Sequence, residues 1–410
     1  MKKKKLIIIG GGAAGFFCAV NAARLNPALD VVILEKSSKI LSKVRVSGGG
    51  RCNVTHSCFN IAELVKRYPR GANFLKKTFH QFFTKDTIEW FAERGVELKT
   101  ESDGRMFPVT DSSQSIIDCL VREANKFGVR WHLNHEVKKI QRQADSGFLV
   151  ETSHGQMSAD HLLVACGGFP KSSQFSWLTD LGHSIMEPVP SLFTFNMPQN
   201  PITKLMGISV EQVQIKIIGT KLVESGPLLI THWGISGPAV LKLSAWGARE
   251  LKARDYRFSI TINWVTEFNE TSIRPEILSI RNDRAIQKII NRNPFRLPQR
   301  LWEHLLELAG INKDWKWADL PAKEQNRLIK LLCGMEMEVS GKTTFKEEFV
   351  TCGGIELSEI DPNTCMSRIA PELYFAGEIL NVDGITGGFN FQHAWTSGFI
   401  VARTVAGKSM

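Results

Sequence analysis

Short apolar runs alternate with amphipathic stretches over the first 190 residues. Leu6–Ile9 and Val31–Leu34 are continuously apolar, as strands buried on both faces are, and the apolar stretch Ala13–Leu25 between them predicts a helix. Ser112–Phe127 carries apolar residues at helical spacing, and a strand-like run follows at Val129–Leu133. This strand and helix order predicts an α/β fold with a mainly parallel sheet covered by helices.

The pattern changes after residue 190. Val213–Ile218 and Arg257–Ile262 read as strands of a different, β-rich region, and helical stretches follow at Gln299–Ala309 and Ala322–Leu332. A run at Glu348–Thr351 is interpreted as the return of the first sheet. The final strand and helix of the first domain are then expected to come from the C-terminal region.

These segments predict a discontinuous first domain with an insertion. Its first part is expected at residues 1–190 and its second part at 347–410. The insertion is expected at residues 191–346, as a β-rich domain carrying a small helical subdomain at about 270–335. A chain of 410 residues that is 43% hydrophobic can bury the cores of two or three such domains.

Glycines follow the first apolar run at once. Gly10, Gly12 and Gly15 have the spacing G-x-G-x-x-G, and Glu35 ends the second apolar run. In this motif the glycines permit a tight turn, close approach of a pyrophosphate and close helix packing, while the acid accepts hydrogen bonds from ribose hydroxyls. Helix N-terminal amides then stabilise the phosphates. The motif indicates a dinucleotide site, and by itself it fits NAD and FAD alike.

Four further segments closely resemble a family of bacterial NAD(P)/FAD-dependent oxidoreductases that includes aminoacetone oxidases and bile-acid-intermediate reductases. They are SGGGRCNVT (Ser47–Thr55), THWGISGPAVLKLS (Thr231–Ser244), TCGGIELSEIDP (Thr351–Pro362) and AGEILNVDGITGGFNFQHAW (Ala376–Trp395). Tyr374–Glu378 also resembles the late Ala-x-Gly-Asp signature of glutathione-reductase-type FAD proteins, with the residue between Ala and Gly absent and glutamate in place of aspartate. The resemblance implies a Rossmann-like FAD-binding domain, a three-part architecture and redox chemistry on one non-covalent FAD.

The motif and the resemblance together suggest which residues contact the cofactor. The loop at residues 43–53 is expected to wrap the pyrophosphate and the flavin ring, and the helix after Gly388 is expected to aim its amides at the ring edge. The expected contacts are Gly10, Gly12, Ala14, Gly15, Glu35, Lys36, Lys43, Gly49, Gly50, Arg51, Cys52, Asn53, Val137, Ala165, Gly167, Gly377, Glu378, Asp383, Gly388, Phe389 and Asn390.

Proton-active side chains near the expected flavin cleft are Cys52, His232, Cys352 and His393. Each is also compatible with a purely structural role, so no general acid or base is assigned. The chain has no C-x-x-C motif, the commonest spacing for zinc or a redox dithiol, and no metal site is expected. The eight cysteines are interpreted as reduced thiols.

Charge and apolar runs bear on location and partners. No apolar run reaches the roughly twenty residues that span a membrane, so a cytoplasmic protein without membrane contact is expected. The formal charge of +10 favours anionic partners, but no nucleic-acid-binding module is recognisable. A small-molecule substrate is therefore expected in preference to nucleic acid.

A second G-x-G-x-x-G domain is absent from the sequence. NAD(P)H is thus expected only as a transient co-substrate, and reoxidation of FAD by oxygen is the alternative. The leading hypothesis is an FAD-dependent oxidoreductase acting on a small or medium organic substrate. Two alternatives stay open: an FAD-dependent RNA-modifying enzyme, suggested by the basic charge, and a flavin-bound redox sensor without turnover.

Overall fold

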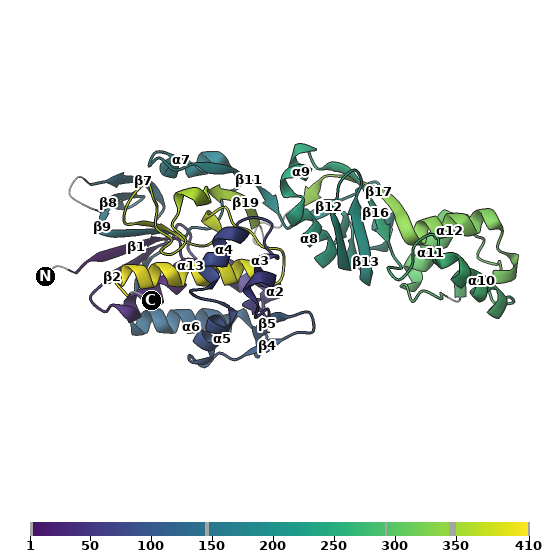
Figure 1. The fold of residues 1–410 in the computed structure, drawn as a ribbon, viewed down its shortest axis with the longest axis horizontal. Helices are drawn as coiled ribbons and strands as arrows, with labels where there is room; N and C mark the ends of the chain where they lie inside the picture. The colour runs from purple at the N-terminus through teal and green to yellow at the C-terminus, as the bar shows by residue number, and fades with distance from the viewer. Residues whose placement is uncertain (1–2, 144–146, 292, 344–349, 409–410) are drawn as a thin grey trace. The chain divides into compact units, whose positions relative to one another are not determined.

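A computed structural model describes residues 3–143, 147–291, 293–343 and 350–408 (Figure 1). The chain divides into two compact units, of which unit 1 comprises Met1–Ser191 with Phe345–Met410 and unit 2 comprises Leu192–Thr344. The expected boundary between residues 346 and 347 lies outside the described residues. Each unit has its own sheet and its own buried core.

A five-stranded sheet forms the centre of unit 1. Its strands pair in parallel in the order β20-β10-β1-β2-β6, so the predicted parallel sheet is present. Its strands are β1 (Lys5–Ile9), β2 (Asp30–Leu34), β6 (Arg130–His132), β10 (His161–Val164) and β20 (Leu373–Phe375). The residues of β10 and β20 are all buried, which explains why these strands read as continuous apolar runs.

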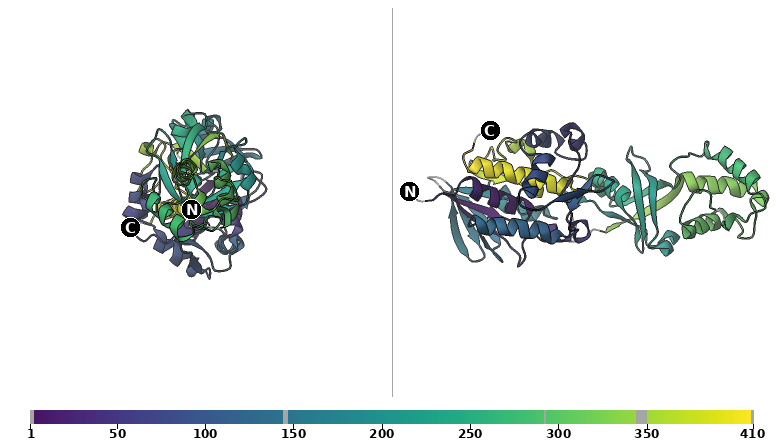
Figure 2. Two further views of the ribbon diagram at one scale, coloured as in Figure 1. Left: turned by 90° about the vertical axis from the view of Figure 1, so that its right-hand side faces the viewer. Right: turned by 90° about the horizontal axis from the view of Figure 1, so that it is seen from below.

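Three helices pack side by side in unit 1. α1 (Ala13–Leu25) contacts both α6 (Ser113–Lys126) and α13 (Phe389–Val405), as Figure 2 also shows. The contact between α1 and α13 is very close, since a Cβ atom at Gly398 would lie 2.6 Å from the carbonyl oxygen of Ala14. The first and last helices of the chain are thus joined through a glycine.

Smaller elements complete unit 1. Two antiparallel three-stranded sheets have the orders β3-β5-β4 and β7-β8-β9. Their strands are β3 (Thr55–His56), β4 (Leu98–Thr100), β5 (Arg105–Pro108), β7 (Val137–Arg142), β8 (Phe148–Thr152) and β9 (Gly155–Ala159). The further helices are α2 (Ser42–Gly50), α3 (Ile61–Val65), α4 (Ala72–Phe79), α5 (Thr84–Ala92) and α7 (Ser176–Thr179), with the short 3₁₀ helices η1 (Ser172–Phe175), η5 (Leu357–Glu359) and η6 (Gly377–Ile379).

The segment expected to rejoin the central sheet forms a different pair. β19 (Val350–Ile355) lies antiparallel to β11 (Ile185–Ser191) in a separate two-stranded sheet. The interpretation of Glu348–Thr351 as the return of the parallel sheet was therefore wrong, and residues 348 and 349 lie outside the described residues. An apolar run in the sequence indicates that a strand is buried, but it does not indicate which strand lies beside it. Here β19 lies so close to β11 that a Cβ at Gly353 would be 2.5 Å from the Glu187 carbonyl oxygen.

Unit 2 is built on a seven-stranded sheet with the order β17-β16-β13-β14-β15-β12-β18. Its strands are β12 (Thr194–Asn196), β13 (Ser209–Ile217), β14 (Val223–Thr231), β15 (Gly234–Ser236), β16 (Arg257–Asn263), β17 (Met335–Ser340) and β18 (Lys342–Thr343). The helices are α8 (Pro238–Trp246), α9 (Ala248–Ala253), α10 (Ile273–Asp283), α11 (Gln299–Ala309) and α12 (Ala322–Gly334), with η2 (Pro201–Leu205), η3 (Ile289–Asn291) and η4 (Trp317–Asp319). Buried alternating residues of β13, β16 and β17 share one hydrophobic core with α10, α11 and α12.

The packing of α1 on α13 yields a stability prediction. Alanine normally stabilises a helix interior relative to glycine. Gly398→Ala should instead destabilise the protein by about 1–3 kcal/mol, because the added methyl group overlaps the Ala14 carbonyl oxygen. The measurement is the melting temperature of the FAD-free protein.

A matched control is Gly334→Ala, near the end of α12. Its Cβ would meet only Glu270 Oε1, at 3.9 Å, so we expect little change in the melting temperature. Equal melting temperatures for Gly398→Ala and Gly334→Ala would contradict the close packing of α1 on α13.

Candidate cofactor site

The glycine motif lies where β1 ends, between its neighbours β2 and β10 in the sheet. Gly10 has φ +111°, and a Cβ there would lie 2.4 Å from the carbonyl oxygen of Ala165, which follows β10. A Cβ at Gly15 would lie 2.0 Å from the carbonyl oxygen of Gly10. Gly10 and Gly15 are therefore required by the protein's own packing, which holds α1 against the sheet.

Gly12 differs from its two partners in the motif. Its φ is −91°, and a Cβ there would meet nothing within 4 Å. Neither packing nor backbone conformation requires glycine at this position, so the open space suits a ligand. Gly12 is also the N-cap of α1 and supplies no side-chain cap, which leaves the amides of Ala13, Ala14 and Gly15 directed at that space. This is the arrangement with which helix N-termini bind phosphates.

The carboxylate of Glu35 is fixed by two backbone amides. Oε2 accepts a hydrogen bond from Gly11 N and Oε1 accepts one from Ser37 N, both at 2.8 Å. Each oxygen retains a second lone pair for a hydroxyl donor. The His135 amide donates to the Glu35 carbonyl oxygen at 2.9 Å, which brings the start of β7 at Val137 beside this end of the site.

A sharp turn lies at the C-terminal end of α2 (Ser42–Gly50), where the backbone leaves helical geometry. Gly48, Gly49 and Gly50 have φ values of +59°, +69° and +86°, and a Cβ at Gly49 or Gly50 would meet nothing within 4 Å. This second open stretch of backbone lies between Lys43 and Arg51, two of the three cationic residues that are expected to contact the cofactor. Glycine is required here by backbone conformation, because all three residues are in the left-handed region.

Arg51 is held by neighbouring residues of unit 1. Its guanidinium pairs with Glu101 at 2.6 Å and with Asp111 at 3.5 Å, and it stacks over the ring of Phe107 at 4.0 Å. Hydrogen bonding to Glu101 raises the pKa of Arg51. Two carboxylates thus orient the side chain of Arg51. They also partly neutralise the positive charge that it presents to an anionic ligand.

Asn53 joins the glycine turn to the N-terminus of α13. With its amide oriented to satisfy both partners, its nitrogen donates to the Thr55 carbonyl at 3.0 Å and its oxygen accepts from Gly388 N at 2.9 Å. Gly388 has φ +89°, and a Cβ there would lie 2.5 Å from the Thr55 carbonyl oxygen. Gly388 caps α13 without a side-chain hydrogen bond, so this helix also begins with uncapped amides.

Phe389 and Asn390 begin α13 and stabilise the surrounding loops. The ring of Phe389 stacks on His56, with centroids 4.8 Å apart. The side-chain amide of Asn390 accepts from Gly384 N at 2.8 Å and donates to the Gly384 carbonyl at 3.0 Å. Both polar atoms of Asn390 are engaged by the loop before the helix, whereas its backbone amide belongs to the uncapped first turn.

Glu378 lies where several distant segments of unit 1 meet. Its carboxylate accepts from Lys43 Nζ at 2.6 Å and from Thr351 N at 2.9 Å. A Cβ at Gly167 would lie 3.6 Å from Glu378 Oε2, and one at Gly377 would lie 3.0 Å from the Ala14 side chain. The fold therefore brings together the end of β20, the end of β10, α2 and the start of α1.

Asp383 occupies a buried ion pair. Its side chain is fully buried, forms a bidentate pair with Arg70 and accepts from Ser191 Oγ at 2.9 Å. Burial raises the pKa of Asp383, and the pairing with Arg70 opposes that shift. This geometry ties the loop before α13 to the protein and leaves no exposed carboxylate atom. Arg70 was missed from the sequence, since nothing in the chain links positions 313 residues apart.

The remaining expected cofactor residue is Lys36, whose Nζ lies 5.4 Å from the centre of the Phe169 ring. Phe169 follows the Gly167-Gly168 pair at the end of β10. The aliphatic stem and ammonium group of Lys36 thus cover the same end of the sheet as Ala165 and Gly167.

The four proton-active candidates have different environments. His393 is buried, its Nε2 lies 3.1 Å from the Gly377 carbonyl oxygen, and burial lowers its pKa to about 4. Cys52 is buried in the turn, where desolvation raises the pKa of its thiol to about 12. Cys352 is buried on β19. His232 is exposed on unit 2 beside Trp233, so the four are not placed together in one unit.

These residues fit a bound FAD. The open backbone at Gly12, Gly49 and Gly50 and the uncapped N-terminus of α1 suit a pyrophosphate. Two buried polar atoms near Glu378 and Gly377, Thr351 Oγ1 and His393 Nδ1, have no hydrogen-bond partner among the described residues. Across the described ranges no cluster of three or more metal-ligating side chains occurs. No helix within those ranges is long and apolar enough to cross a membrane.

Fold and site together define a Rossmann-type FAD-dependent oxidoreductase, and the comparisons with known proteins agree. Residues 4–404 match the family model described as HI0933-like protein Rossmann domain, so the chain belongs to that family. The expected family, fold class and enzyme class are thereby confirmed.

Named relatives cover nearly the whole chain. The ribosomal RNA dihydrouridine synthases of Escherichia coli and Haemophilus influenzae are each 30% identical, over 96% of this chain and 96% of the relative. The 3-dehydro-bile acid delta(4,6)-reductase of Clostridium scindens is 27% identical over the same shares. Among solved structures, the 3-ketosteroid delta1-dehydrogenase of Sterolibacterium denitrificans has a TM-score of 0.52 at 12% identity, covering 99% of this chain and 100% of the other, which shows the fold.

The special status of Gly12 yields a binding prediction. Gly12→Asp should fold normally, because its side chain enters open space, yet lose FAD by steric block and charge repulsion at the pyrophosphate. The measurement is flavin absorbance per folded chain after reconstitution. Gly12→Ala, which adds one methyl group and no charge, should weaken binding less. Full FAD occupancy in Gly12→Asp would contradict the assignment.

The neutral, buried His393 predicts a pH dependence of stability. Its folded pKa of about 4 lies below its ordinary value of 6.5, so the unfolded chain binds more protons between these pH values. Stability should fall as pH drops from 6.5 to 4, by about 3 kcal/mol at most from this residue. His393→Gln keeps a donor for the Gly377 carbonyl without titrating. Denaturant unfolding at several pH values should show a flatter profile in His393→Gln, and parallel profiles would refute the prediction.

Proposed function

We propose that this chain reduces a carbon–carbon double bond conjugated to a carbonyl group, and that its substrate is a uridine of ribosomal RNA. The observation that carries the proposal is the 30% identity, over 96% of both chains, with two enzymes named ribosomal RNA dihydrouridine synthase. The FAD-binding fold and the site described above are compatible with such a reduction.

The relatives' names describe one kind of chemistry. Conversion of uridine to dihydrouridine saturates a double bond polarised by a neighbouring carbonyl, and a delta(4,6)-reductase acting on a 3-dehydro bile acid does the same on a steroid ring. Saturation adds a hydride to the carbon remote from the carbonyl and a proton to the carbon beside it. The three named relatives share this chemical requirement although their substrates differ in size.

This chain's residues would hold the cofactor and orient it. When bound, reduced FAD supplies the hydride. The first-turn amides of α1 at Gly12 would hold the pyrophosphate, and the Glu35 carboxylate would accept hydrogen bonds from the ribose hydroxyls. The uncapped amides of α13 after Gly388 would stabilise negative charge at the opposite end of the site. His393 stays neutral at physiological pH and adds no positive charge of its own.

The net charge of the chain is compatible with RNA as the substrate. The chain carries 51 basic against 41 acidic residues, and a +10 protein attracts a polyanion. The sequence-based preference for a small molecule is reversed in this proposal because of the two dihydrouridine synthase relatives, and the basic surplus supports that choice. NAD(P)H is proposed as a transient electron donor, because the sequence contains one dinucleotide motif.

A small enone is the second candidate, favoured by the bile-acid reductase relative. Both candidates predict reduction of an activated double bond. They differ in whether the purified enzyme acts on a free small molecule or requires RNA.

The test supplies the FAD-loaded protein and NADPH or NADH with ribosomal RNA from a host that lacks the gene. Nucleoside mass spectrometry should show new dihydrouridine at a defined position, because the C5–C6 bond of one uridine gains two hydrogens. A matched reaction contains a 3-oxo-4-ene steroid, followed by loss of its ultraviolet absorbance. Gly12→Asp serves as the FAD-deficient control.

Dihydrouridine formation by wild type and its loss in Gly12→Asp would support the proposal. Unmodified RNA together with a reduced steroid would move the assignment to the small-enone candidate. Turnover of neither substrate with either nucleotide would exclude both.

A further inference from the structure

A hollow outside the cofactor site lies on unit 1, where the loop after β3 meets α4 and α5. We call it the Phe59 pocket. Its volume is about 450 Å³, within the range of sites that hold small ligands. Eight residues line it: Phe59, Asn60, Ile61, Ala62, Lys76, His80, Phe83 and Lys85.

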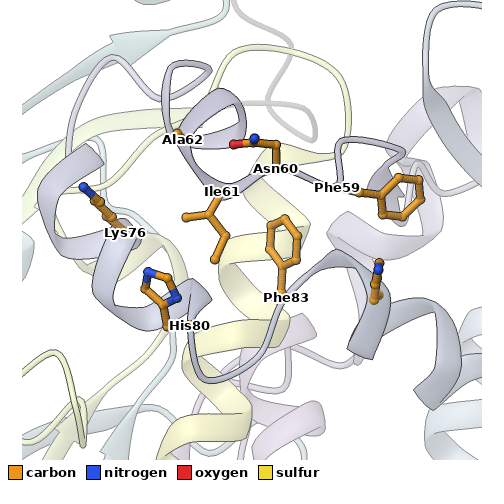
Figure 3. Close-up of a pocket in the computed structure, with 8 residues that line it drawn as sticks. Phe59, Asn60, Ile61, Ala62, Lys76, His80 and Phe83 are labelled. Atoms are coloured by element: carbon orange, nitrogen blue, oxygen red, sulfur yellow. The ribbon is translucent and has the colours of Figure 1, made fainter.

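The lining combines apolar surface with basic groups. Figure 3 shows Ile61 and Phe83 in the middle, with Lys76 and His80 on one side and Phe59 on the other. None of the eight lining residues is acidic. The pocket therefore offers aromatic and aliphatic contact surface at its centre and positive charge at its edge.

The cations at the edge are available to a ligand. Among the described residues, neither Lys76 nor Lys85 forms an ion pair, and both side chains are exposed. Nearby carboxylates are already engaged: Glu63 pairs with Lys66 at 2.7 Å, and Asp86 accepts from Phe83 N at 2.6 Å. The positive charge of Lys76 and Lys85 is thus not neutralised by a paired carboxylate.

Phe59 is a large apolar side chain held out in solvent, 52% exposed. Its backbone is ordered on both sides, since Cys58 N donates to the His56 carbonyl at 2.7 Å and Asn60 caps α3 by accepting from Glu63 N at 3.2 Å. An exposed aromatic ring on a fixed loop beside unpaired cations is the combination that stacks on a base and binds its phosphates.

The pocket is connected to the cofactor site by a short segment. Phe59 lies only six positions after Asn53, which bonds to the Gly388 amide, and a segment of that length spans at most about 20 Å. Along it, His56 stacks on Phe389 at the start of α13. A ligand that extends from the flavin end of the site for a few nucleotides can reach the pocket.

We propose that the Phe59 pocket binds single-stranded RNA next to the reacting uridine, with one unpaired base stacked on Phe59 and Phe83 and the flanking phosphates on Lys76 and Lys85. This inference rests on the proposed function and adds to it a second, non-catalytic contact. The pocket reads no particular sequence, because stacking and phosphate contacts are available to every base.

Binding is measured without turnover, as fluorescence anisotropy of a labelled single-stranded oligouridylate on the FAD-loaded protein. Phe59→Ala should weaken binding roughly ten-fold through lost stacking. Lys76→Gln should also weaken binding, and it should reduce the slope of log affinity against log salt by about 0.7, the value for one phosphate contact on a single strand.

Matched controls lie close by. Lys77→Gln removes the same charge from the neighbouring residue of α4, which does not line the pocket, and Val109→Ala truncates another half-exposed apolar residue of unit 1. Both controls should bind like wild type. An oligomer with abasic sites separates base stacking from phosphate binding. Because it has no base to stack, wild type and Phe59→Ala should bind it equally. Each variant is compared only at full FAD content.

The outcomes separate the pocket from the proposed function. Weakened oligomer binding in Phe59→Ala and Lys76→Gln, with both controls unchanged, supports the pocket even if wild type makes no dihydrouridine. Unchanged affinity in both variants overturns the pocket even if wild type modifies ribosomal RNA. Equal losses in Lys76→Gln and Lys77→Gln would also overturn it, since they would indicate a diffuse charge effect.

Discussion

The structure of unit 1 depends on close approach between backbones that only glycine permits. A side chain at Gly10, Gly15, Gly388 or Gly398 would overlap a carbonyl oxygen of another segment. These contacts hold α1 against the end of β1 and α13 against α1, and so fix two helix N-termini that lack side-chain caps. Uncapped amides are binding groups only when the helix that carries them cannot move.

Three carboxylates of unit 1 have different roles because their surroundings differ. Glu35 is held by amides and retains lone pairs for a ligand. Glu378 pairs with Lys43 and joins α2 to β19. Asp383 is buried in an ion pair with Arg70, where removing one partner would leave an uncompensated charge. The first of these faces the cofactor region, and the last stabilises the loop that leads into α13.

Family membership and substrate choice come from different parts of the molecule. The family match together with the glycine-rich edge of the sheet indicates an FAD enzyme, but neither distinguishes a uridine from a steroid enone, because both substrates present a polarised double bond. Discrimination must come from surfaces beyond the flavin. The Phe59 pocket on unit 1, which is lined by an exposed aromatic ring and two lysines, is the surface that we propose for this discrimination. Fold alone would not have indicated RNA.

The sequence by itself determined the first β-α-β unit, the dinucleotide motif and the C-terminal helix, because glycine spacing and apolar periodicity are local properties. Resemblance to the family also singled out Glu378 as an expected cofactor contact, which stays a prediction. Tertiary structure decided the pairing of β19 with β11 and the burial of Asp383 against Arg70. It also showed that Gly12, unlike Gly10 and Gly15, is not required by packing. Those facts depend on which distant segments meet in space, and a one-dimensional pattern carries no information on that.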